Sequence, residues 1–386
     1  MMRKLTLLWA LSLLLLPSCN RPERQEEKPD DKDQPQNTVA APDIFVKGME
    51  GIHTFRIPAI VKTTKGTLVA FCEGRVNSGS DTGFIRLILR RSTDRGKTWG
   101  PVIKVWEDPG NTCGNPCPVV DPRTGRIHLM MTWNNGKDGK SAGDFNKPGM
   151  TVDTRRVWYT YSDDDALTWA KPVECTSTTK HEDWGWYATG PCHAIILEKG
   201  AYQGRILMPC DHNVIGGSGY SHVVYSDNGG KTWQIGGEVK GGNESCVAEL
   251  EDGTVVMTCR NSSGQRKLAW SKDGGLTFDA GTNIKSLPDP TCQAAILSTV
   301  IDGETVLIHS NCATNSRTNL TVKASRDGGK TWTTGHQIHA GPAAYSDIVM
   351  VSDTHLGVFY ENGASSSYEK ISFVSIPVRL ALTNVQ

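Results

Sequence analysis

One short phrase occurs five times in this chain and constrains its fold more than any other feature. The copies are STDRGKTW (92–99), SDDDALTW (162–169), SDNGGKTW (226–233), SKDGGLTF (271–278) and SRDGGKTW (325–332). The Asp or Asn at the third position can accept hydrogen bonds from nearby backbone N–H groups, and the glycines permit positive φ. The closing Trp or Phe is large enough to anchor the turn against a core. Each copy therefore predicts a hairpin turn, and their recurrence predicts a repeated structural unit.

The segments before these turns have the composition of β-strands. They read FIRLILRRS, RVWYTYS and YSHVVYS, which are rich in Val, Ile and Tyr and end in turn-forming residues. Strand-forming units of roughly 40 to 50 residues have the size of a four-stranded propeller blade. A β-sandwich or a right-handed β-helix would not need such a turn at the end of so many hairpins. We therefore predict an all-β fold, a six-bladed β-propeller over residues 43–386.

The N-terminal residues predict export. A basic start at Arg3 and Lys4 precedes the apolar run LTLLWALSLLLLPSC, which predicts a signal peptide over residues 1–18. Leu16 to Cys19 resembles a bacterial lipoprotein cleavage box, so Cys19 is expected to carry lipid; an ordinary secretory signal cut nearby is the alternative. Residues 19–42 are charged and Pro-rich, which predicts a disordered tether. We expect a lipoprotein of the bacterial cell envelope, in the periplasm or on the outer-membrane surface, which touches the membrane only through its lipid.

Composition excludes several other classes of function. The 41 basic and 41 acidic residues balance and form no basic block, so no nucleic acid is expected as a partner. The 11 cysteines have no zinc-type spacing, so no metal site is predicted. No organic cofactor is expected either. After export the cysteines could form disulfides, although several lie in apolar strand-like runs, where buried free thiols are a common alternative. We expect a monomer.

Three arginines point to an anionic ligand. Arg56 lies in the motif FRIP, Arg260 follows the apolar strand VVMTC, and Arg317 lies in the polar stretch TNSRTN. They belong to different predicted blades, whose strands can bring them together near a propeller axis. Three guanidinium groups at one point repel one another unless an anion lies between them, and their planar forks suit a carboxylate.

The FRIP motif, the five turns and the three arginines together resemble the sialidase (neuraminidase) family, from about residue 55 to residue 361. The resemblance implies a six-bladed propeller on which Arg56, Arg260 and Arg317 bind the carboxylate of sialic acid. It implies that Asp81, in SGSDTG, is the acid/base residue. It also implies that Glu244, in NESC, and Tyr345, in AAYSD, are the base and the nucleophile.

The resemblance implies three supporting residues as well. Arg75, in CEGR, would contact the substrate, and Asn115, in GNPCP, would lie on a loop that lines the sugar site. Glu361, in FYENG, would orient the first arginine. No catalytic position of the family pattern is missing.

The implied activity is that of an exo-α-sialidase, a glycoside hydrolase that releases terminal sialic acid from glycoproteins, glycolipids or oligosaccharides. Sialidases are known to use a Tyr nucleophile. A neutral phenol avoids the repulsion that a carboxylate nucleophile would meet from the substrate carboxylate, and its high pKa requires a base such as Glu244. The expected outcome is retention through a covalent tyrosyl intermediate. A trans-sialidase has the same residues, and a non-catalytic sialic-acid-binding propeller would keep the arginines, so both remain alternatives.

The roles of two further segments stay open. The loop HEDWGWYATGP contains Trp184, Trp186 and Tyr187, which either stack on a sugar or pack between blades. Asp211 and His212, at the end of GRILMP, are candidates for contact with the sugar or its glycerol chain.

Overall fold

The structure is a computed structural model that describes residues 42–136 and 147–383. Residue contacts gather Ala41–Gln386 into one compact unit. The predicted signal peptide and the predicted tether, up to residue 41, lie outside the described residues.

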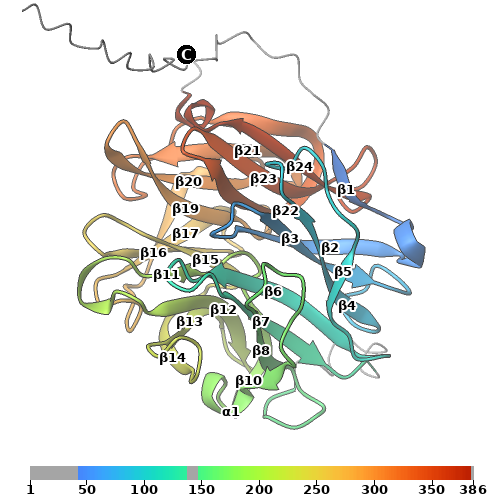
Figure 1. Cartoon of the computed structure of the whole chain (residues 1–386). Helices are drawn as coiled ribbons and strands as arrows, with labels where there is room; N and C mark the ends of the chain where they lie inside the picture. The colour runs from blue at the N-terminus through green and yellow to red at the C-terminus, as the bar shows by residue number, and fades with distance from the viewer. Residues whose placement is uncertain (1–41, 137–146, 384–386) are drawn as a thin grey trace, which may run out of the picture. The chain divides into compact units, whose positions relative to one another are not determined.

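The described chain forms four antiparallel-rich sheets (Figure 1). The largest contains β2 (Thr54–Lys62), β3 (Leu68–Arg75), β4 (Ile85–Ser92), β5 (Ile103–Trp106), β6 (Thr112–Val120), β7 (Ile127–Asn134), β8 (Arg156–Ser162) and β9 (Val173–Glu174). The second contains β10 (Trp184–Thr189), β11 (Ile195–Ile196), β12 (Ile206–Val214), β13 (Gly219–Ser226) and β14 (Gln234–Lys240).

The remaining strands of the described chain form two further sheets. One contains β15 (Ser245–Glu249), β16 (Val255–Cys259), β17 (Gln265–Ser271) and β18 (Thr282–Pro288). The last contains β19 (Ala295–Ile301), β20 (Glu304–Cys312), β21 (Thr318–Ser325), β22 (His336–Ser352), β23 (His355–Asn362), β24 (Lys370–Pro377) and β1 (Asp43–Val46). The helical segments are short: α1 (Thr176–Thr179), η1 (Met49–Gly51), η4 (Gly200–Tyr202) and η5 (Val378–Leu382).

The inner strands follow one another in a closed ring. β2 contacts β6, β6 contacts β11, β11 contacts β15, β15 contacts β19, β19 contacts β22, and β22 contacts β2 again. Figure 1 shows the sheets succeeding each other around the molecule in chain order. The all-β prediction is therefore confirmed, and the ring has the arrangement of a propeller. The number of six blades stays a prediction, because the described strands group into four sheets.

The five repeated turns share one hydrogen-bond pattern, seen first at Asp94. Its Oδ1 accepts the backbone N–H of Thr98 at 2.9 Å and the hydroxyl of Ser92 at 2.8 Å, while Ser92 Oγ accepts the backbone N–H of Gly96 at 2.8 Å. The same contacts to the third-position side chain recur in the other copies, at Asp164, Asn228, Asp273 and Asp327. The pattern satisfies the turn locally, as the sequence predicted.

The closing aromatic rings pack outside their own hairpins. The Trp99 ring lies 5.4 Å from the ring of Phe373 in β24, and the Trp169 ring lies 5.7 Å from that of Phe71 in β3. The Trp233 ring likewise lies 5.3 Å from that of Tyr159 in β8. In these copies the turn therefore holds two groups of strands together, in addition to closing its own hairpin.

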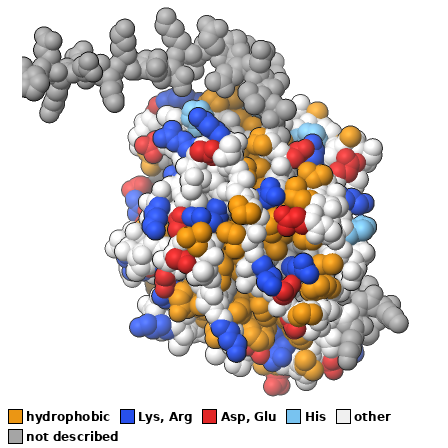
Figure 2. Space-filling view, turned by 45° about the vertical axis from the view of Figure 1, so that its right-hand side comes forward, with side chains coloured by type: hydrophobic (Ala, Val, Ile, Leu, Met, Phe, Trp, Pro, Cys, Tyr) orange, Lys and Arg blue, Asp and Glu red, His pale blue; other side chains and the backbone are white. Residues whose placement is uncertain are grey.

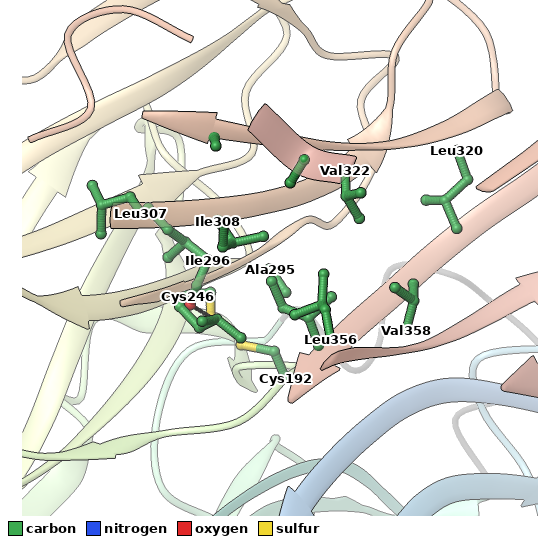
Figure 3. Close-up of a cluster of buried hydrophobic side chains, with 14 of the residues drawn as sticks. Cys192, Cys246, Ala295, Ile296, Leu307, Ile308, Leu320, Val322, Leu356 and Val358 are labelled. Atoms are coloured by element: carbon green, nitrogen blue, oxygen red, sulfur yellow. Dashed lines mark hydrogen bonds between the residues drawn. The ribbon is translucent and has the colours of Figure 1, made fainter. Parts of the chain in front are cut away.

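The core lies between the packed sheets. Figure 3 shows one part of it, where Cys246 of β15, Ile296 of β19, Ile308 of β20 and Leu356 of β23 converge, all at most 1% exposed. The ten cysteines of the described residues are free thiols, and nine of them are buried. No disulfide therefore occurs in the described part of the chain, where burial of apolar surface is the main stabilising contribution.

Acidic and basic side chains alternate on the face shown in Figure 2, with apolar side chains between them. This dispersion agrees with the balanced composition of 41 acidic and 41 basic residues. Within the described residues, none of the helices is long and apolar enough to cross a bilayer.

Strand register separates the repeated turns from the candidate site. Ser92, where the first turn begins, pairs with Leu68, whereas Arg75 pairs with Ile85 at the other end of the same two strands. In β16 and β17, Ser271 pairs with Val255, and Cys259, just before Arg260, pairs with Lys267. The turns therefore lie at one end of the strands, and the candidate arginines lie at the opposite end.

Candidate active site

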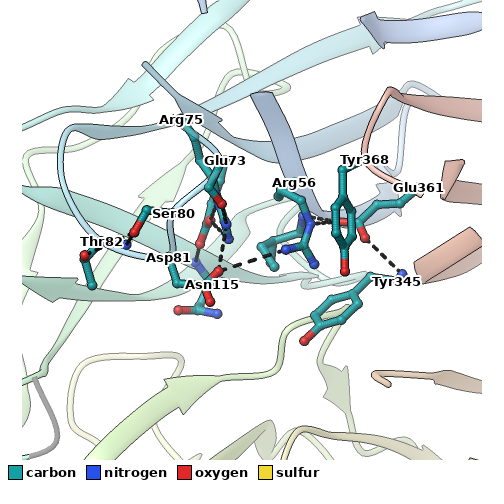
Figure 4. A network of polar contacts seen from close by, with 12 residues as sticks. Arg56, Glu73, Arg75, Ser80, Asp81, Thr82, Asn115, Tyr345, Glu361 and Tyr368 are labelled. Carbon is teal, nitrogen blue, oxygen red and sulfur yellow. Dashed lines mark hydrogen bonds and ion pairs between the residues drawn. The ribbon is translucent and has the colours of Figure 1, made fainter. Parts of the chain in front are cut away.

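The FRIP motif contains a local distortion of β2. Register with β3 shifts between Arg56 and Ala59, and Ile57 adopts φ 63°, which is rare for a β-branched residue. Glu361 Oε1 accepts the N–H of Ile57 at 2.8 Å and the Nε–H of Arg56 at 2.7 Å. The buried carboxylate of Glu361 thus stabilises the distortion and orients the Arg56 guanidinium (Figure 4).

Three predicted arginines surround the ring of Tyr345. The guanidinium carbons of Arg56 and Arg317 lie 5.0 Å and 5.5 Å from the ring centroid, and Arg260 Nη1 donates to the phenolic oxygen at 2.9 Å. Arg56 lies in β2, Arg260 follows β16 and Arg317 precedes β21, and these strands belong to three different sheets. The meeting of the three arginines at one tyrosine satisfies the geometric condition for binding a carboxylate next to that ring.

Tyr345 and Glu244 form a direct pair. The hydroxyl of Tyr345 donates to Glu244 Oε1 at 2.5 Å, and Glu244 Oε2 accepts Arg260 Nη1 at 2.7 Å. Burial, with the negative charge of Glu244 beside it, raises the pKa of Tyr345 well above its usual value, although Arg260 and Arg56 act in the opposite direction. The phenol is therefore neutral in this structure, with a carboxylate placed to take its proton.

Asp81 lies on the loop after β3, with its side chain 64% exposed. Arg75 Nη1 contacts its Oδ1 at 2.7 Å, and Arg56 Nη1 lies 4.0 Å away (Figure 4). Partial burial raises the pKa of Asp81, but the guanidinium groups of Arg75 and Arg56 outweigh it and hold the pKa below the usual value. Asp81 is thus ionised at neutral pH in this state.

Arg75 is fixed by a residue that sequence reasoning missed. Its Nη2 contacts Glu73 Oε2 at 2.8 Å, and Glu73 Oε1 accepts the backbone N–H of Asn115 at 2.9 Å. Glu73 was detectable in principle, since alternate residues of a strand share one face and Glu73 is two positions before Arg75. Asn115 lies within β6, at a register shift, and not on a loop as predicted. It adopts φ 53° and is held at the pocket wall by its contact with Glu73.

One pocket of about 450 Å³ connects most of these side chains. Its lining residues are Ile57, Glu73, Arg75, Asp81, Asn115, Arg155, Trp186, Asn213, Asn243, Glu244, Arg260 and Tyr345. Arg56 and Arg317 stand against the Tyr345 ring and are not among the lining residues. The structure therefore brings all nine sequence-predicted site residues to one place.

Two residues outside the prediction complete the arginine cluster and the pocket. Tyr368 accepts Arg317 Nη1 at 2.6 Å, and its ring lies 4.1 Å from the guanidinium carbon of Arg56. Arg155 lines the pocket at 1% exposure. Neither stands out in the sequence, since Tyr368 follows a serine run and Arg155 precedes a second arginine.

The segment that we predicted as an aromatic loop forms strand β10, so that prediction was wrong, and its aromatic residues divide between the two roles that were left open. Trp186 lines the pocket, whereas Trp184 and Tyr187 are buried in the core between sheets. The ring of Trp184 stacks on that of His212 at 3.4 Å, so His212 also packs internally. Asp211 lies behind Trp186, whose Nε1–H it accepts at 2.9 Å.

Known proteins share this sequence pattern and fold. Residues 66–358 match the family model described as a BNR repeat-like domain. A sialidase of Bacteroides fragilis is 31% identical over 82% of this chain and 62% of its own length, and an exo-alpha-sialidase of Aspergillus fumigatus is 32% identical over 84% of this chain and 82% of its own length. This chain therefore spans less than two thirds of the Bacteroides fragilis protein.

Among solved structures, the Hadza microbial sialidase Hz136 superposes with a TM-score of 0.81 at 28% identity, over 88% of this chain and 68% of the other. The family model covers every lining residue of the pocket except Ile57. The chain belongs to the sialidase family of glycoside hydrolases.

Proposed function

We propose that this chain is an exo-α-sialidase that hydrolyses terminal sialic acid from glycoproteins, glycolipids or oligosaccharides, with retention through a covalent tyrosyl intermediate. The observation that carries the proposal is the Tyr345–Glu244 hydrogen bond of 2.5 Å beneath three convergent arginines. We further infer a six-bladed propeller, export as a lipoprotein through Cys19, and a monomeric enzyme.

In the proposed reaction, the substrate carboxylate binds Arg56, Arg260 and Arg317 next to the Tyr345 ring. Tyr345 attacks the anomeric carbon as Glu244 takes the phenolic proton. The arginines hold the carboxylate while positive charge develops on the sugar ring.

Asp81 protonates the leaving oxygen and later activates water. Its lowered pKa suits the second role better than the first. A bound substrate carboxylate would offset the arginine charges and raise the pKa of Asp81 toward that of a proton donor. Substrate binding would thus favour the protonated form of Asp81, which is the form that acts as the general acid.

The test is hydrolysis of a fluorogenic α-sialoside by the full chain and by the Tyr345→Phe variant. Turnover by the parent with near-complete loss in the folded variant is expected. Proton NMR of the first product is expected to show the α-anomer, which is the retained configuration.

Two outcomes would replace the proposal. Release of an anhydro sugar, or transfer to an added acceptor sugar, would identify a trans-sialidase. Binding of sialic acid without release of the fluorophore would identify a sialic-acid-binding propeller.

A further inference from the structure

Arg155 is a buried cation with unused hydrogen-bond donors. Its Nη2 donates to the side-chain oxygen of Asn115 at 2.6 Å, and its guanidinium carbon lies 4.0 Å from the centroid of the Trp186 ring. Its Nε has no acceptor, and no carboxylate of the described residues lies within 4.0 Å of its nitrogens. A buried donor without an acceptor is destabilising, so such a group in a pocket wall is suited to a ligand oxygen.

Three other arginines of the site each contact a carboxylate. Arg75 contacts Glu73 at 2.8 Å, Arg260 contacts Glu244 at 2.7 Å, and Arg56 contacts Glu361 at 2.7 Å. Arg317 instead donates to the Tyr368 hydroxyl and to the backbone oxygen of Thr291. For Arg155, the one side-chain acceptor among the described residues is the neutral amide of Asn115. The remaining donors of Arg155 are therefore available to a molecule in the pocket.

In the described structure the Arg155 guanidinium contacts Asn115 and Trp186 and no member of the arginine cluster, to which a chain of pocket-wall contacts connects it. Arg56 Nη1 lies 4.0 Å from Asp81 Oδ1, and Arg75 Nη1 lies 2.7 Å from the same oxygen. Arg75 Nη2 in turn lies 2.8 Å from Glu73 Oε2. Glu73 then contacts Asn115, which accepts the hydrogen bond from Arg155. A sugar whose carboxylate binds beside Tyr345 would thus present its opposite ring edge to Arg155.

The charge of the pocket favours an uncharged acceptor. Its lining includes three cationic side chains, Arg75, Arg155 and Arg260, and three anionic ones, Glu73, Asp81 and Glu244. Because these charges balance, the wall offers no net attraction for a second anion beyond the carboxylate at the arginine cluster. A hydroxyl or an amide carbonyl can accept a hydrogen bond from Arg155 without adding a charge to the pocket.

Trp186 holds the guanidinium plane in position. Its Nε1–H donates to Asp211 at 2.9 Å, and its backbone N–H donates to Asn213 at 2.7 Å. Asp211 is fully buried and also accepts Asn243 Nδ2 at 3.2 Å. The indole is thus fixed at its edge, and the Arg155 guanidinium rests on its face.

We propose that Arg155 is a specificity-determining residue that donates a hydrogen bond to an uncharged oxygen on the sugar ring edge opposite the carboxylate. In a sialoside this oxygen belongs to the C4 hydroxyl or to the carbonyl of the C5 acylamino group. The inference rests on the proposed sialidase function and concerns the same pocket.

The test compares Arg155→Gln, Arg155→Lys and the parent on three fluorogenic sialosides: the 5-acetamido compound, its 4-deoxy analogue and its 5-hydroxy analogue. Arg156→Gln is the matched control, because Arg156 pairs with Glu174 on the surface and does not line the pocket. Thermal denaturation establishes first that each variant is folded. If Arg155→Gln is unfolded, the comparison is made with Arg155→Lys, which retains the charge.

For the parent, the analogue that lacks the relevant oxygen is expected to lose about ten- to a hundredfold in kcat/KM, as for a charge-assisted hydrogen bond. In Arg155→Gln, kcat/KM for the 5-acetamido compound should fall by the same factor, whereas kcat/KM for the analogue that lacks the relevant oxygen should fall by about twofold or less. Arg155→Lys should recover part of the discrimination between the two substrates. The analogue that shows this coupling identifies the C4 or the C5 oxygen. Arg156→Gln is expected to match the parent on all three.

Equal losses on all three substrates in Arg155→Gln would mean a merely structural role and would overturn the inference. If the parent turns over no sialoside, the proposed function fails, and calorimetric titration with free N-acetylneuraminic acid then decides the inference separately. Loss of binding in Arg155→Gln but not in Arg156→Gln would support it, and equal binding would overturn it.

Discussion

Tyr345 donates its hydroxyl proton to Glu244 across 2.5 Å, although the two residues are 101 positions apart in the chain. Arg260 Nη1 contacts both of them, at 2.9 Å from the phenolic oxygen and 2.7 Å from the carboxylate. A base in contact with a neutral phenol, with a cation beside both, is the arrangement that a tyrosine nucleophile requires.

A fluorinated, activated sialoside that slows the second step is expected to label Tyr345 covalently. Mass spectrometry of the digested full chain should find the added sugar on the peptide that contains Tyr345. In Glu244→Gln the labelling rate should fall by about 10²- to 10⁴-fold, because the phenol loses its base. Tyr161→Phe, a change outside the pocket, should label like the parent. A label on any other residue would contradict the assigned nucleophile.

Glu361→Gln is expected to reduce both stability and substrate affinity. The buried carboxylate holds Arg56 Nε at 2.7 Å and the backbone N–H groups of Ile57 and Tyr345 at 2.8 Å and 3.1 Å. Loss of its charge leaves Arg56 without this ionic partner, which should lower the free energy of unfolding by about 3 kcal/mol. KM should rise because the guanidinium is less well oriented.

The matched control for this change is Glu304→Gln, at an ion pair with Arg326 in which both side chains are exposed. Exposed ion pairs contribute about 0–1 kcal/mol, so the free energy of unfolding measured in urea should barely change in this variant. Similar losses in the two variants would show that the Glu361–Arg56 contact is not special.

Gly96→Ala should destabilise the protein more than Gly66→Ala. The two glycines have nearly equal φ, 85° and 84°, so both substitutions carry the left-handed strain of about 1–2 kcal/mol. A Cβ at Gly96 would lie 2.1 Å from Cε1 of Phe373, whereas a Cβ at Gly66 would meet nothing within 4 Å. The clash should add about 1–3 kcal/mol for Gly96→Ala. Equal midpoints in urea unfolding would refute this role of the repeated turn.

Acid should destabilise the β12–β13 hairpin through two buried histidines. Burial, with cationic neighbours, lowers the pKa of His212 to about 3 and that of His222 well below its usual value. Their Nδ1 atoms lie 3.0 Å apart, so both rings cannot be protonated in place. The histidines of the unfolded chain bind protons at a higher pH than the buried ones do. The stability that comes from keeping them neutral is therefore fully present above about pH 6.5 and is lost as the pH falls from there toward 3.

The measurement is the free energy of unfolding between pH 7.5 and pH 4. Each histidine should contribute a slope of up to about 1.4 kcal/mol per pH unit in this window. His212→Asn, which keeps a polar atom near the position of Nδ1, should have a shallower slope than the parent. An unchanged slope would assign the acid sensitivity to other groups.

Much of the site was predictable because its residues belong to short motifs. Arg56 in FRIP, Arg75 in CEGR and Tyr345 in AAYSD were identified by resemblance, and the structure places them around one pocket. Glu73 was missed, although its position two residues before Arg75 places both on one face of β3. Tyr368 was missed because its contact with Arg317 depends on a loop whose sequence contains no motif.

By itself, the sequence determined the repeated turns and the all-β class, because those hydrogen bonds join residues two to four positions apart. It did not distinguish Arg155 from Arg156. Only the tertiary structure decided that Arg155 is buried on Trp186 in the pocket wall while Arg156 pairs with Glu174 at the surface. The physical reason is that neighbouring residues point in opposite directions, and the closure of the ring of strands decides which direction is the pocket.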